Sequence, residues 1–158
     1  MNMIRSLLAA TVLTFSIGTA FAVDTSYSGP ATGDKLAAAR SAIQAKQWSV
    51  AIDELKKVGD TGNADWNNLM GYTHRKATTP DYAAAERYYD EALRLDPKHR
   101  GALEYSGELY LIQGNLAKAE QRLAALDKVC LLPCEEYTDL KNAVARFKAN
   151  GNRHVAAP

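Results

Sequence analysis

The stretch that decides the fold runs from Tyr82 to Leu123 and reads YAAAERYYDEALRLDPKHRGALEYSGELYLIQGNLAKAEQRL. Small and apolar residues recur in it every three or four positions, which is the period of an amphipathic α-helix. Two pairs of turn-forming residues, Asp96-Pro97 and Gly114-Asn115, interrupt the period. The stretch therefore predicts three consecutive helices joined by short turns.

The same helical period continues outward in both directions, from Asp34 to about Lys148. Further turn signals occur at residues 59–62, 78–80 and 132–133. Together the breaks divide this region into segments of about 10–15 residues, each of single-helix length. Alanine is abundant while valine and isoleucine are sparse, a composition that favours helices over strands. We expect an all-α fold.

The segments repeat in pairs when Gly71 is aligned with Gly107. Each glycine falls in the first helix of a pair, where we expect a side chain to collide with the second helix. Small residues follow in the second helices at Ala85 and Ala119, and large residues follow at Tyr89 and Leu123. This order suits two helices that cross closely, with small residues at the crossing and large ones filling the gaps beside it.

This pattern resembles the tetratricopeptide repeat, a helix-turn-helix unit of about 34 residues. Ala92 and Pro97 also match the family pattern, and the two glycines are 36 positions apart because the turn between Arg75 and Pro80 is longer. A weaker, earlier unit has matching residues at Ala39, Trp48, Ala51 and Leu55. The resemblance implies a solenoid of about three repeats followed by a C-terminal capping helix.

We divide the chain accordingly into a signal peptide (1–22), a flexible lead-in (23–32), the repeats (33–128), a bend with the capping helix (129–150) and a disordered tail (151–158). The repeats span 33–62, which is degenerate, 63–97 and 98–128. Pro133 is expected in the first turn of the capping helix. That helix carries an apolar stripe made of Leu140, Ala143, Val144 and Phe147.

The first residues have the features of an export signal. Arg5 precedes an apolar run from Ser6 to Ile17, and Ala20-Phe21-Ala22 supplies the small residues that signal peptidase requires. The run is shorter than the about 20 residues that span a bilayer, so no stable membrane anchor is expected after cleavage. We predict cleavage after Ala22 and export to the periplasm of a Gram-negative bacterium.

Charge and motifs exclude several classes of function. The chain has 19 basic and 18 acidic residues, so it lacks the basic excess of a nucleic-acid-binding protein. No nucleophile–base arrangement, phosphate loop or metal-ligand spacing occurs, and we predict neither enzyme activity nor a cofactor or metal. Of the histidines, His74 is predicted to pack between helices, His99 to lie exposed at a helix start and His154 to lie in the tail.

Cys130 and Cys134 are the only cysteines. In an exported protein the expected state is a disulfide, here a staple across the bend before the capping helix. A redox-active pair or a soft-metal site is the alternative, although the usual redox spacing is shorter.

The resemblance also implies a binding surface, because tetratricopeptide repeats line a concave groove with residues of their first helices. The positions that match are Arg40, Asn68, Tyr72, Arg75, Glu104, Glu108 and Leu111. Such a mixed surface suits an extended or helical peptide. We therefore predict a periplasmic adaptor that binds a protein or peptide partner, and the alternative is an accessory factor in thiol or metal handling that acts through Cys130 and Cys134.

Overall fold

The computed structural model describes residues 33–132 and 134–154. Within them the chain forms seven helices and no strand: α1 (Ala37–Gln44), α2 (Trp48–Val58), α3 (Ala64–Lys76), α4 (Tyr82–Leu95), α5 (Arg100–Ile112), α6 (Leu116–Val129) and α7 (Glu135–Ala149). The predicted signal peptide and lead-in, Pro133, and residues 155–158 of the predicted tail lie outside the described residues.

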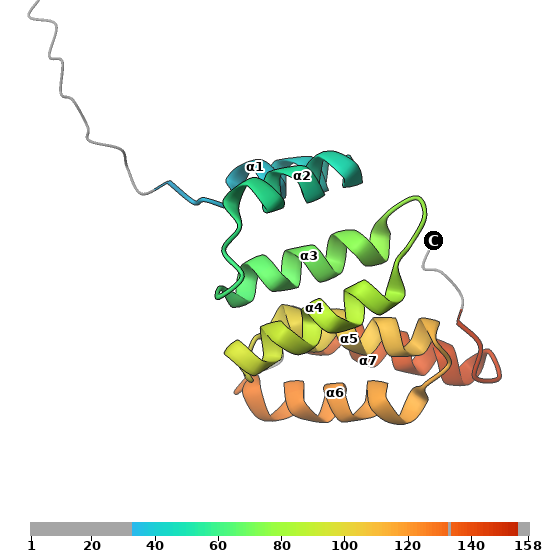
Figure 1. The fold of residues 1–158 in the computed structure, drawn as a ribbon. Coiled ribbons are helices and arrows are strands. Elements are labelled where there is room, and N and C mark those ends of the chain that lie inside the picture. The colour runs from blue at the N-terminus through green and yellow to red at the C-terminus, as the bar shows by residue number, and fades with distance from the viewer. Residues whose placement is uncertain (1–32, 133, 155–158) are drawn as a thin grey trace, which may run out of the picture. The chain divides into compact units, whose positions relative to one another are not determined.

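Consecutive helices pack as neighbours in three pairs, α1 with α2, α3 with α4, and α5 with α6 (Figure 1). The first helices of the pairs also contact one another, α1 with α3 and α3 with α5, and α7 then packs on both α5 and α6. The predicted all-α arrangement of three pairs and a capping helix is thus confirmed. None of the helices in the described ranges has both the length and the apolar character to cross a membrane.

Side chains define where α3, α4, α5 and α6 begin. Asn63, Asp81 and Asn115 each accept a hydrogen bond from a backbone N–H in the first turn, at 2.9, 2.8 and 3.1 Å. His99 does the same at α5, where its Nδ1 accepts from the N–H of Ala102 at 3.1 Å. A cap of this kind stabilises a helix by about 1 kcal/mol. The turns that interrupt the sequence pattern therefore also start the helices.

His99 departs from its prediction as an exposed residue. Its side chain is only 13% exposed, because one ring nitrogen caps α5 while Nε2 lies 3.0 Å from Oδ1 of Asp65 at the start of α3. The contact joins the N-terminal ends of two first helices.

The core follows the predicted register of the second helices. Ala85, Tyr89 and Ala119 are 0% exposed, whereas Ala117, on the outer side of α6, is exposed. A Cβ at Gly71 would lie 2.7 Å from the ring of Tyr89 in α4, which is the predicted collision with the second helix. Since real Cβ contacts are not this short, α3 can approach α4 this closely only with glycine.

For Gly107, the prediction that a side chain would collide with the second helix of its own pair is wrong. A Cβ there would lie 2.5 Å from Leu140 of α7, the capping helix, which is nearer than any atom of the second helix α6. Leu140 is 0% exposed and fills the space over the glycine. The small residue of the third repeat is therefore required by the cap.

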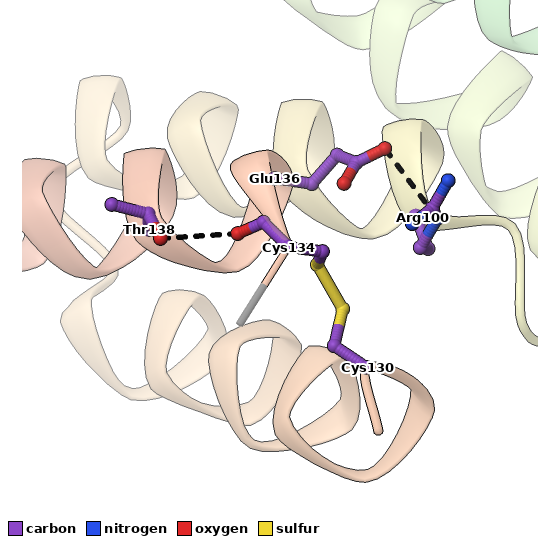
Figure 2. The surroundings of a disulfide bond; sticks show 5 residues. All are labelled: Arg100, Cys130, Cys134, Glu136 and Thr138. Carbon is purple, nitrogen blue, oxygen red and sulfur yellow. Dashed lines mark hydrogen bonds and ion pairs between the residues drawn. A yellow bond between two sulfur atoms is a disulfide. The ribbon is translucent and has the colours of Figure 1, made fainter. Parts of the chain in front are cut away.

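The cap combines apolar packing with a covalent link. Leu140, Val144 and Phe147 are buried against the core, as the apolar stripe predicts, and Ala143 is half-buried. Figure 2 shows the disulfide between Cys130, after the end of α6, and Cys134, the residue before α7. The two Cα atoms are 5.8 Å apart, so the bond closes the bend between the two helices.

Candidate functional site

The seven residues predicted to line the groove all lie on first helices. Arg40, Tyr72 and Glu108 are partly exposed, whereas the other four keep exposed fractions of 8% or less: Asn68, Arg75, Glu104 and Leu111. The position of a residue within the repeat therefore predicts that it lies on a first helix, but it does not predict how exposed its side chain is. The role of these residues in binding stays a prediction.

Arg40, on α1, ties the first repeat to the second. Its guanidinium lies 3.2 Å from Asp34, just before α1, and 3.6 Å from Asp65 at the start of α3. All three side chains are about half exposed, so the pairs are screened and weakly stabilising. Arg40 remains accessible on this face.

A row of aromatic rings crosses the same face. The rings of Trp48 and Tyr72 meet edge to face with centroids 6.3 Å apart, and those of Tyr72 and Tyr105 are 4.8 Å apart. All three residues are only partly buried. Of these three residues, the sequence pattern placed Tyr72 alone in the groove. The available signal was that Tyr105 directly follows Glu104, a predicted groove residue.

Arg75 occupies the centre of this surface. Its Nη1 donates to Oε2 of Glu108 at 2.6 Å, and its Cζ lies 5.4 Å from the ring centroids of both Tyr72 and Tyr105. Burial by itself lowers the pKa of Arg75, but Tyr89 and Glu108 hold the pKa above its ordinary value. Arg75 is thus a buried, charged residue that joins α3 to α5, and it has little exposed surface with which to contact a partner.

Glu104 lies one turn before Glu108 on α5 and is in a different electrostatic environment. Burial, followed by the nearby charges of Glu108, Asp139 and Glu136, raises the pKa of its carboxyl to about 8. Among the described residues its carboxylate has no hydrogen-bond donor and no ion-pair partner. We call the surface formed by Tyr72, Arg75, Glu104, Tyr105 and Glu108 the groove.

A pocket of about 320 Å³ continues the groove toward the C-terminal ends of α3 and α5. Its floor is apolar, with Leu111, Ile112 and Phe147, and its rim includes Arg146 and His154. His154 reaches this place because the backbone turns back after α7, where the N–H of residue 152 donates to the carbonyl of Phe147 at 3.0 Å. The pocket could hold an apolar side chain beside a polar group.

The remaining candidates for chemistry are occupied by structural contacts. His74 stacks on the ring of Tyr88 with centroids 5.5 Å apart, which is the packing role predicted for it. Cys130 and Cys134 are joined to each other, and in the described part of the chain no group of three or more potential ligands is placed to hold a metal ion. Between the cysteines, Leu131 and Leu132 are 97% and 80% exposed.

In a comparison with known protein families, residues 81–129 match the family model of the tetratricopeptide repeat. The match covers α4, α5 and α6 and contains the stretch from Tyr82 to Leu123 that decides the fold. It confirms the resemblance inferred from the repeat pattern. A comparison with curated proteins finds no match.

Proposed function

We propose that the chain is a periplasmic adaptor that binds a protein or peptide partner in its groove, because residues 81–129 match the tetratricopeptide repeat, a family whose members act as protein-interaction scaffolds. The family is typically non-enzymatic, and we propose the same for this chain. Export to the periplasm rests on the signal-like N-terminal residues.

The observation that carries the proposal is the row of partly exposed aromatic rings formed by Trp48 of α2, Tyr72 of α3 and Tyr105 of α5. Tyr and Trp are enriched at the centres of protein interfaces because they bury a large area with little loss of conformational freedom. Here Tyr72 and Tyr105 are held in place by Arg75, whose guanidinium lies 5.4 Å from each ring centroid. The surface is therefore pre-organised, which lowers the entropic cost of binding.

Site-specific photo-crosslinking in intact cells tests the proposal. A benzophenone amino acid at Tyr72 should capture a defined partner, and the same group at Ala117, exposed on the outer side of α6, should not. Adding Tyr105→Ala should reduce the capture from position 72. Capture from Ala117 with none from Tyr72 would move the binding surface to the second helices.

Export is tested separately by fractionation. We expect the protein in the periplasmic extract with Val23 as its first residue. Full-length protein in the cytoplasm would contradict the proposed location.

A further inference from the structure

Glu104 is a buried acid on a surface proposed to bind a partner. The residue is only 8% exposed to solvent. No hydrogen-bond donor or cation among the described residues contacts its carboxylate. Burying an ionised carboxyl without a partner is costly, so folded proteins pair such groups or keep them protonated. The groove therefore contains an acid without the partner that would stabilise its charged form.

The charges around Glu104 do not supply that partner. On its own helix lies Glu108, and α7 contributes Glu136 and Asp139, which are all acidic. Two nearby cations, Arg75 of α3 and Arg100 of α5, are already paired, and Arg75 lies 2.6 Å from Glu108. On the side of α7, Arg100 lies 3.5 Å from Glu136 (Figure 2). Around Glu104 the acidic side chains of α5 and α7 thus outnumber the cations, and both cations are already paired.

Asn68 gives a second, independent observation. It is 7% exposed, and its Oδ1 is buried without a hydrogen-bond partner. Its amide packs on α5 at Gly101, where a Cβ would lie 3.1 Å from Nδ2. Gly101 is one turn before Glu104, so this buried amide lies against the same stretch of α5 as the unpaired carboxyl.

We propose that Glu104 receives a lysine or arginine side chain of the peptide that binds in the groove. The inference rests on the proposed function and specifies the chemistry of the partner. A cationic side chain supplies the missing donor to Glu104 and offsets the excess of acidic over basic side chains around it.

Proton linkage follows from the state of the free protein. Because burial and the neighbouring acids raise the pKa of Glu104 to about 8, the carboxyl is mostly protonated at neutral pH. A cationic side chain binds the ionised form, so binding at neutral pH releases this proton to solvent. The affinity should therefore rise with pH and level off above pH 8.

Selection from a library of random peptides, carried out at pH 8 on the immobilised full chain, tests the proposal. We expect the peptides that bind to share a lysine or arginine at one position. Their affinity should fall at least tenfold with Glu104→Gln, which keeps the shape of the side chain. Glu91→Gln, at an exposed acid of α4 paired with Arg94, should leave the affinity unchanged. Replacing the basic residue of the peptide by norleucine should cause a similar loss with the unaltered protein.

The outcomes separate this inference from the proposed function. Peptides that require Tyr72 but have no shared basic residue, or that bind Glu104→Gln equally well, overturn the cation site and leave groove binding intact. If no selected peptide loses affinity with Tyr72→Ala, both the groove and the cation site are wrong. A pH-independent affinity for the basic peptide between pH 6 and 9 also contradicts the inference.

Discussion

Helix α5 packs on α3 on one side and on α7 on the other, and the two contacts are built differently. Toward α3, charges are complementary, since Arg75 pairs with Glu108 and lies beside the rings of Tyr72 and Tyr105. Toward α7, Glu104 faces further acids. Successive repeats are thus joined by a buried charge pair, whereas the part of the cap beside Glu104 adds further acids.

Apolar packing and the disulfide hold α7, together with ion pairs of Glu136 with Arg100 and of Lys148 with Glu120. Leu140 fills the space over Gly107, and Val144 and Phe147 are buried beside it. The bond between Cys130 and Cys134 fixes the start of the helix. The cap therefore covers α5 without supplying a counter-charge to Glu104. The predictions below change one contact at a time.

The largest effect is expected at Glu104 and depends on pH. Its pKa is about 8 in the folded protein, against 4.5 ordinarily, so between these values the folded state holds a proton that the unfolded chain has released. Raising the pH through this window therefore lowers the free energy of unfolding. A shift of this size corresponds to about 5 kcal/mol, and solvent screening at the open side of the groove reduces the expected change to about 3 kcal/mol.

Urea unfolding of wild-type protein and Glu104→Gln measures this effect. At pH 5 the two proteins should be nearly equally stable, and at pH 9 the variant should be the more stable one. Glu91→Gln, on the outer helix α4, controls for the loss of one charge. A constant difference between Glu104→Gln and wild type across this range would show that Glu104 is solvated or paired.

Breaking the ion pair between Arg75 and Glu108 should change the free energy of unfolding less, and we expect the change to be a loss of stability. Glu108→Gln leaves the guanidinium of Arg75, with 6% side-chain exposure, without its counter-charge. Removing one partner of a fully buried pair costs about 3–5 kcal/mol, and the 29% exposure of Glu108 lowers the expected loss to about 2 kcal/mol. Urea unfolding at pH 7 measures it.

The matched control is Glu86→Gln, which removes the 3.2 Å contact to Lys118 between α4 and α6. Lys118 is 49% exposed, so this loss should stay below about 1 kcal/mol. Equal losses at Glu108 and Glu86 would mean that the burial of Arg75 contributes nothing to the pair.

The smallest effect is expected from the disulfide. Cys130→Ser with Cys134→Ser should leave a folded helical protein that is less stable by about 1–2 kcal/mol, since a short ring restricts the unfolded chain only moderately. Hydrogen exchange should show faster opening after about Gly114 and no change in α1 and α2, because solenoid stability is local. Full stability with a lost cellular phenotype would instead favour the thiol or metal role.

Sequence reasoning predicted the helices well because their signals are local. Turn residues such as Asp81 and Asn115 both break the period and cap the next helix. The register of α6 followed from Ala119, which matches the repeat, and Ala117 is exposed as expected. The cysteine pair could be predicted because its two residues lie on either side of one bend.

The contacts between repeats could not be predicted in this way. Gly107 was assigned to its own repeat, whereas Leu140 lies beyond the matched pattern, and no local signal links the two. The burial of Arg75 depends on Glu108 and two rings from different helices. Likewise, an acid without a partner cannot be recognised at Glu104 until its neighbours in space are known.

The most direct test of this difference between the two sides of α5 is an NMR titration of the Glu104 side chain. The carboxyl carbon is observed in protein labelled with ¹³C-glutamate, and its signal is assigned by its absence in Glu104→Gln. In the free protein we expect a midpoint at about pH 8, and a midpoint well below that when a basic peptide is bound. A midpoint near 4.5 in the free protein would contradict an unpaired, buried carboxyl and remove the basis for the cation site.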